Sequence, residues 1–156
     1  MTTLAEIRAA IVAELNAIAA IGVVHDYERY AAREGDFRTL YLYDLGAGEK
    51  QIRGWYVRRL STVETSAALG RFEETHQWLI RGFMAIDDAS ASEKTFDDLI
   101  EAIRARFRAN ESLGGLIASV VAPGGKGVDL VESQPVLFGG VLCHSARLQL
   151  ATWHGI

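Results

Sequence analysis

The stretch QIRGWYVRRLSTVETS at residues 51–66, followed by RFEETHQWLIRGFMAI at residues 71–86, decides the fold. Both runs are long, and both are rich in the β-branched and aromatic residues that are typical of strands. The four residues between them, AALG at 67–70, end on a glycine. Two long strands joined by a short glycine-containing connection predict an antiparallel hairpin.

Two amphipathic helices flank this hairpin in the sequence. The first is predicted to begin after Thr3, with Glu6 in the position of a capping box, and to end at Gly22. The second is predicted to begin at Thr95, with acidic residues in its first turn, and to end at Asn110. Apolar residues at steps of three and four predict one buried stripe on each helix: Ile7, Ile11, Leu15 and Ile18 on the first, and Phe96, Leu99, Ile100, Ile103 and Phe107 on the second.

Shorter extended segments complete the expected sheet. They are predicted at residues 38–43, 116–121, 128–131 and 141–153, and the stretch 135–140 is expected to separate the last two. Two glycine-containing segments, residues 44–50 and 122–127, are expected to form turns. This order of elements predicts an α+β fold in a single domain over residues 1–156, with two helices packed on one face of a mostly antiparallel sheet.

Composition narrows the classes of function. The 156 residues are 49% hydrophobic and 23% charged, which is typical of a soluble globular domain. Twenty acidic and sixteen basic side chains give a net charge of −4, which argues against a protein that coats nucleic acid through a basic face. The single cysteine, Cys143, has no intramolecular disulfide partner, which favours a reducing, cytoplasmic setting. Because no eighteen consecutive residues are apolar and no signal-peptide pattern is present, neither a membrane span nor a leader is expected.

No residue pattern indicates catalysis, a metal or a cofactor. The four histidines stand far apart in the chain, without a cysteine or carboxylate at metal-ligand spacing. His76 and His144 fall in predicted strands and could meet across the sheet, although satisfied or surface histidines are the favoured interpretation. Cys143 points to the opposite strand face from His144, which argues against a nucleophile–base pair and favours a small buried cysteine. The glycines around Lys126 lack the spacing of a phosphate-binding loop. Because none of these candidate sites has a catalytic pattern, the chain is predicted not to be an enzyme.

The hairpin instead points to an interface. Trp, Tyr and Arg side chains occur on both of its faces, although two helices cover only one side of the sheet. These residue types are enriched where proteins contact other proteins. The alternative is that the long strands curl and bury both faces at one end. On composition alone, the candidate interface residues are Trp55, Arg58, Arg59, Arg81 and Lys126.

Several stretches together give the chain a family likeness. They are VHDYERY at residues 24–30, the apolar group of Phe37, Leu40 and Tyr41, GWYVRR at residues 54–59, THQWLIRGF at residues 75–83, and the helix from Phe96 to Phe107. With the capped first helix and the closing strand, they resemble the tail terminator (tail-completion) proteins and related neck or minor tail proteins of long-tailed bacteriophages and prophages. The resemblance covers essentially the whole chain. It lies in the order of the elements and in the types of residue along them.

This resemblance implies a structural role. Tail terminators are α+β proteins that assemble as a ring, typically a hexamer, on the end of the growing tail tube. The ring stops polymerisation of the tube protein and presents a surface to the head–neck connector protein, without turnover of a substrate. The implied partners are further copies of this chain, the tube protein and the connector, with no membrane and no sequence-specific nucleic acid. The implied location is the host cytoplasm during assembly and then the virion tail or neck.

Two other functions stay open. A neck, connector or other minor tail component would need the same kind of small, ring-forming α+β subunit. A ligand-binding or enzymatic α+β domain would instead need a closed apolar pocket with convergent polar groups and a perturbed titratable residue. A pocket that brings His76 and His144 within hydrogen-bonding distance would favour this last interpretation. A ring needs two different complementary patches on each subunit, and the glycine-rich tips could reach neighbouring subunits.

Overall fold

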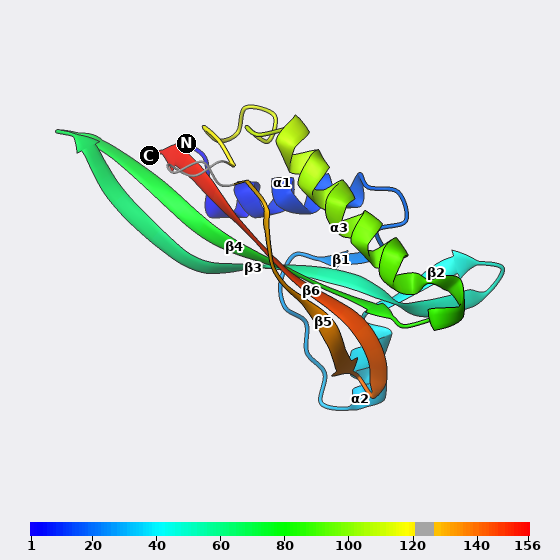
Figure 1. Cartoon of the computed structure of the whole chain (residues 1–156). Coiled ribbons are helices and arrows are strands. Elements are labelled where there is room, and N and C mark those ends of the chain that lie inside the picture. The colour runs from blue at the N-terminus through cyan, green and yellow to red at the C-terminus, as the bar shows by residue number, and fades with distance from the viewer. Residues whose placement is uncertain (121–126) are drawn as a thin grey trace.

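A computed structural model describes residues 1–120 and 127–156 of the chain (Figure 1). The elements in chain order are α1 (Leu4–Asn16), β1 (Val23–His25), α2 (Glu34–Thr39), β2 (Leu42–Gly46), β3 (Glu49–Ala68), β4 (Arg71–Ala85), the 3-10 helix η1 (Asp88–Ser90), α3 (Ser92–Ala109), β5 (Asp129–Phe138) and β6 (Val141–Gly155). The strands form one sheet in the order β1-β3-β4-β6-β5, with β2 also paired to β3. Only β1 runs parallel to its partner among the described strands, so the predicted α+β fold with a mostly antiparallel sheet is confirmed.

The β3–β4 hairpin forms the middle of the sheet, as its composition predicts. Its strand pairing extends outward to Ala68 opposite Arg71, so that the far end of the hairpin projects beyond the helices (Figure 1). A β-bulge between Arg59 and Ser61 shifts the alternation of side chains along β3. Thr62 therefore lies on the same face as Arg59, where a strict alternation would place it on the opposite face.

One face of the sheet is covered by α1 and α3 (Figure 1). The predicted apolar stripes of both helices pack there, in a core that includes Trp55 and Trp78 of the hairpin. The indole of Trp55 stacks on Phe96 of α3, with ring centroids 5.6 Å apart, and its Nε1 donates to the carbonyl of Ile21. Gly82 is paired with Trp55, and a Cβ there would lie 2.2 Å from the indole, so the packing requires a glycine.

The opposite face carries a second, aromatic cluster beneath α2. Phe37 packs on Phe138, and Tyr41 lies edge-on to Phe138 and Phe83. The predicted strand over residues 38–43 is wrong for most of that range, because α2 occupies its first part and β2 begins only near its end. Phe37 lies in α2 and Tyr41 in the turn that follows it, and this turn brings both rings to the same cluster. The two long helices thus share one face as predicted, and a third, unpredicted helix lies on the other.

The capping box predicted for α1 is confirmed. Thr3 Oγ1 accepts a hydrogen bond from the backbone N–H of Glu6, and the Glu6 carboxylate accepts one from the backbone N–H of Thr3. The helix ends at Asn16, before the predicted stop at Gly22. Gly22 serves a different purpose: its φ is +104°, and a Cβ there would lie 2.2 Å from the carbonyl oxygen of Arg53. It permits the chain to pass close to β3.

The cap predicted for α3 is wrong. The helix begins at Ser92, three residues before Thr95, and Ala91 precedes it in the left-handed conformation. The hydroxyl of Ser92 accepts a hydrogen bond from the backbone N–H of Asp87 and also bonds to Nε2 of His144 on β6. The start of α3 is therefore set by a contact to the sheet, and a local cap at Thr95 is not needed.

The C-terminal third departs most from the prediction. Residues 116–120 form no strand and make only an isolated bridge to β6, and residue 121 lies outside the described residues. β5 continues through Pro135, which was expected to separate two strands. A proline is tolerated there because β5 is the last strand of the sheet. The final strand, predicted at 141–153, is confirmed and extends to Gly155.

The two predicted glycine turns have different outcomes. The turn expected over residues 44–50 is shorter than predicted, because β2 ends at Gly46 and β3 begins at Glu49. Of the turn expected over residues 122–127, all but Gly127 lies outside the described residues.

Candidate functional site

The outer part of the β3–β4 hairpin, residues 58–72, which we call the arm, extends beyond the helices (Figure 1). Its tip from Ser66 to Phe72 is two-stranded, whereas its earlier part pairs with residues of β4 that also pair with β6. Every residue of the arm is exposed, whereas residues 54–57 of β3, directly before it, are all buried. The same strand pairing runs through both parts of the hairpin. The arm is therefore held by backbone hydrogen bonds to its own partner strand and not by a hydrophobic core.

Hydrophobic side chains are exposed along the arm. Leu69 is fully exposed at its turn, and Leu60, Val63 and Phe72 are exposed along its strands. Single exposed apolar residues are ordinary on protein surfaces, but several on one projecting element are typical of a surface that another chain covers.

The outer edge of β3 is unpaired along the arm. β1 pairs with β3 only as far as Tyr56, and β2 only as far as Ile52. Within the described residues, β3 therefore has no strand partner on its outer side from Val57 onward. At the other side of the sheet, β5 is the last strand, with a bulge after Leu130 and a proline at position 135. The unpaired edge of β3 allows a second chain to add a strand, whereas the bulge and the proline hinder such pairing at the edge of β5.

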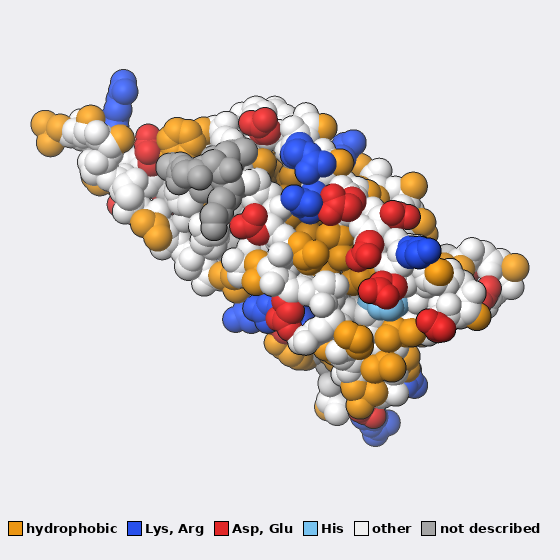
Figure 2. All heavy atoms as spheres, viewed as in Figure 1, with side chains coloured by type: hydrophobic (Ala, Val, Ile, Leu, Met, Phe, Trp, Pro, Cys, Tyr) orange, Lys and Arg blue, Asp and Glu red, His pale blue; other side chains and the backbone are white. Residues whose placement is uncertain are grey.

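A second exposed apolar patch lies at the turn between β5 and β6. Leu137 and Leu142 are cross-strand partners, and both are exposed; we call them the turn patch. Figure 2 shows hydrophobic side chains gathered at this end of the molecule, away from the arm. Arg38 of α2 donates a hydrogen bond to the carbonyl of Gly139, which ties the turn to the body.

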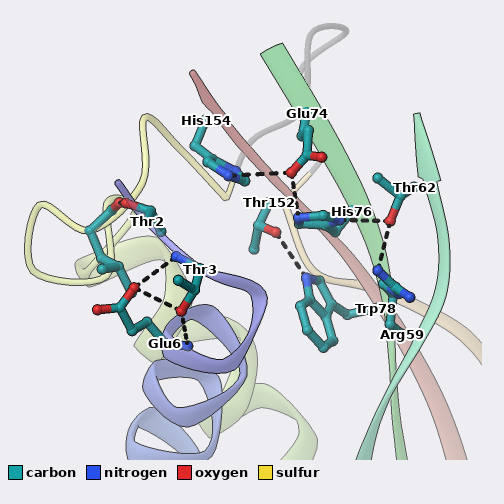
Figure 3. A network of polar contacts seen from close by, with 11 residues as sticks. Thr2, Thr3, Glu6, Arg59, Thr62, Glu74, His76, Trp78, Thr152 and His154 are labelled. Atoms are coloured by element: carbon teal, nitrogen blue, oxygen red, sulfur yellow. Dashed lines mark hydrogen bonds and ion pairs between the residues drawn. The ribbon is translucent and has the colours of Figure 1, made fainter. Parts of the chain in front are cut away.

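Where the arm joins the body, a glutamate and two histidines meet; we call Glu74, His76 and His154 the base cluster (Figure 3). Glu74 and His76 are two residues apart on β4 and therefore share a face of the strand. His154 of β6 is the cross-strand partner of Glu74. His76 and His154 are only 2% and 3% exposed, whereas the side chain of Glu74 is 27% exposed. Oε2 of Glu74 lies 3.4 Å from Nε2 of His76 and 3.6 Å from Nε2 of His154.

Side chains from β3 orient the base cluster. Oγ1 of Thr62 lies 2.7 Å from Nδ1 of His76 and also accepts a hydrogen bond from Arg59 (Figure 3). Burial lowers the pKa of the His76 imidazole below its ordinary value, and the carboxylate of Glu74 acts in the opposite direction. The neutral form of His76 is therefore favoured near pH 7.

The base cluster leaves polar atoms unsatisfied. Among the described residues, Nε2 of His76 and Nδ1 of His154 are buried without a hydrogen-bond partner. The separations from Glu74 exceed the usual length of a hydrogen bond. One ligating atom from each of the three residues nevertheless lies within 4.8 Å of the others, which is the arrangement of residues that can hold a metal ion.

The predicted interface residues fall in different environments. Trp55 is wholly buried, so its prediction as an interface residue is wrong: α1 and α3 cover the sheet face that carries it. Arg58 and Arg59 are exposed at the start of the arm, and Arg58 forms an ion pair with Glu28, so their role in an interface stays a prediction. Arg81 is half-buried in the body, and Lys126 lies outside the described residues.

His76 and His144 do not meet. The register of β4 and β6 places His144 opposite Met84, near the end of β4 that is far from His76. His144 instead bonds to the hydroxyl of Ser92. Cys143 is fully buried, and burial raises the pKa of its thiol to about 11, so the predicted buried cysteine is confirmed.

The base cluster was missed in the sequence because its members are not grouped as metal ligands usually are. Glu74 and His76 are two residues apart, so on a strand they share a face, and this signal was present in the sequence. His154 joins them only through the register of β4 with β6, which local residue patterns do not determine.

Comparisons with known proteins yield no family assignment. No protein-family model matches the chain, and no curated protein matches it. Among the helices of the described residues, none is both long enough and apolar enough to cross a membrane.

Proposed function

We propose that this chain is a tail assembly protein of a phage or prophage, of the terminator type. It caps the tail tube as a ring, ends polymerisation of the tube and offers a surface for head joining. The observation that carries the proposal is the arm, which is exposed throughout residues 58–72 and bears hydrophobic side chains. Ordering such an element costs conformational entropy, and little burial within its own chain offsets that cost. Contact with a neighbouring subunit or with the tube would supply the missing burial.

A closed ring of identical subunits needs a heterologous contact, in which two different patches on each subunit fit together. The arm and the turn patch are two such surfaces, and they lie at different ends of the molecule (Figures 1 and 2). At about 3.3 Å per residue, the strand from Arg58 to Ala68 spans roughly 35 Å, which is enough to reach across a neighbouring small domain. The unpaired edge of β3 supplies backbone groups that can extend a neighbour's sheet.

The hollow beside His144 is an open depression with charged side chains on its rim, among them Asp88, Glu93 and Lys94. This hollow lacks the closed apolar lining that a ligand-binding or enzymatic α+β domain would need. That class of function is the alternative from outside virion assembly.

A neck or other minor tail role is the nearer alternative, because it would use a ring-forming subunit of the same kind. The two roles differ in the partner that the ring contacts first. A terminator acts on the tube protein during tail growth, whereas a neck protein acts on the head–neck connector after the tail is complete.

Deletion of the gene from the phage or prophage that carries it tests the proposal. After induction, particles are examined by negative-stain electron microscopy, with a plasmid copy of the intact gene as the control. The terminator role predicts overlong or irregular tails beside tail-less, DNA-filled heads, because tube polymerisation is no longer stopped. Tails of normal length that fail to join heads would move the assignment to the neck. Normal particles from the deletion strain would contradict an assembly role.

A further inference from the structure

We propose that Glu74, His76 and His154 bind a zinc ion at the base of the arm (Figure 3). This inference goes beyond the assembly role and does not depend on it. Two imidazoles and one carboxylate are a ligand set that zinc commonly uses, with a fourth position left for water or another ligand.

The two separations between the Glu74 carboxylate and the histidine nitrogens fit tetrahedral coordination. Ligands about 2.0–2.1 Å from a tetrahedral zinc ion are about 3.3 Å from one another, and neighbouring octahedral ligands at that distance would be about 3.0 Å apart. Oε2 of Glu74 lies 3.4 and 3.6 Å from Nε2 of His76 and His154. Both separations are long for hydrogen bonds and close to the edges of a tetrahedron around one ion.

Burial makes the two histidines of the base cluster difficult to explain without a ligand. Nε2 of His76 is buried and has no hydrogen-bond partner among the described residues, although nearly all buried polar atoms in proteins are paired. A bound cation would satisfy this nitrogen directly. The partial exposure of Glu74 gives the ion a route to the site from solvent.

Thr62 can orient His76 as a metal ligand. Its Oγ1 lies within hydrogen-bonding distance of Nδ1 of His76 and has a second lone pair beyond the one that accepts from Arg59. An Nδ1–H donated to this oxygen leaves the lone pair of Nε2 directed away from β3 and available to the ion. Outer hydrogen bonds of this kind fix the tautomer and ring orientation of metal-bound histidines.

Arg59 places a positive charge near His76, but one pair of like negative charges beside the base cluster favours a cation. Glu64 of β3 is the cross-strand partner of Glu74 in the ladder, and like charges directly opposite each other destabilise a strand pair. A divalent ion at the base cluster would offset this repulsion. It would also link β4 to the C-terminal end of β6 and so fix the arm relative to the body.

Metal binding can be measured on the full-length chain without a histidine tag, after removal of metals with a chelator and dialysis. Zinc chloride is titrated by calorimetry at pH 7.5, and cobalt chloride is added in parallel to record the absorption of the bound ion. We expect one zinc ion per chain and the intense visible bands of tetrahedral cobalt. Glu74→Gln keeps the size of the side chain and is expected to weaken zinc binding at least tenfold, as is His154→Gln.

His144→Gln is the matched control, because it removes a strand histidine that lies outside the base cluster. It should bind zinc as the unchanged chain does. The proposal is overturned if the unchanged chain shows no saturable uptake of zinc. It is also overturned if Glu74→Gln, whose site is partly exposed and whose fold circular dichroism can verify, binds as tightly as the control. An octahedral cobalt spectrum would contradict the tetrahedral assignment.

Discussion

The two halves of the β3–β4 hairpin share one ladder but differ in what their side chains contact. In the body, Trp55 and Trp78 lie in the core beneath α1 and α3. In the arm, β3 from Arg58 to Ala68 and the first two residues of β4 are exposed. The backbone pairing continues from one half to the other, so the two halves differ in the burial of their side chains and not in their strand pairing. The comparison teaches that a long hairpin can anchor a fold with one half and leave the other free for contacts with other chains.

The boundary between the halves is structurally marked. The bulge between Arg59 and Ser61 lies there, and it turns Thr62 toward His76. Without the bulge, Thr62 would face the other side of the sheet and could not contact the base cluster. Substitutions in the body and in the arm test whether the two parts differ in stability as sharply as they differ in burial.

The largest expected effect is in the body. Trp55→Ala removes a fully buried indole, its stacking on Phe96 and its hydrogen bond to the carbonyl of Ile21. We expect the free energy of unfolding in urea to fall by about 3–5 kcal/mol. Leu69→Ala in the arm is the control and should change it by less than about 0.5 kcal/mol. Equal losses from the two variants would contradict the division into body and arm.

Thiol chemistry gives a second comparison. Cys143 is buried and its pKa is raised to about 11, whereas a cysteine placed in the arm by Ser66→Cys would be exposed. Because the thiolate is the reactive form, we expect an aromatic disulfide reagent at pH 8 to label Cys143 at least about a hundredfold more slowly. The two rates should converge in denaturant. Comparable rates in the folded protein would show that Cys143 is accessible.

Glycine-to-alanine substitutions test the close contact between Gly82 and Trp55 in the core. A methyl group at Gly82 would overlap the ring of Trp55, so Gly82→Ala is expected to lower the free energy of unfolding by about 1–3 kcal/mol. Gly35 of α2 has open space at its Cβ position and no positive φ. Gly35→Ala should therefore cause no loss in the same denaturation experiment. If Gly82→Ala were equally harmless, the close contact with Trp55 would be wrong.

The smallest expected effect on stability is in the arm itself. Val63→Thr and Leu69→Ser replace exposed apolar side chains that no core contact supports. Each should shift the free energy of unfolding by no more than about 0.5 kcal/mol, as measured by chemical denaturation of the isolated chain. A loss larger than that would mean that the arm packs against its own body.

The features that could be predicted from the sequence are those that depend on local spacing. The capping box at Thr3, the stripes on the two long helices and the central hairpin all follow from patterns within one element. The features that could not be predicted depend on contacts between distant segments. α3 begins at Ser92 because of a bond to β6, and His154 reaches Glu74 only through strand register. Trp55 was assigned to an interface because alternation does not reveal which face the helices cover.

The most direct test of the arm as an assembly device is complementation of the deleted gene. The arm variant carries Val63→Asp and Leu69→Asp, and the control carries the same two charges at Ala9 and Ala105, which are exposed on α1 and α3. Both proteins are first shown to unfold at the denaturant concentration of the unchanged chain. We predict that the control restores infectious particles and that the arm variant does not. Restoration by the arm variant would contradict the central claim that other chains cover the arm.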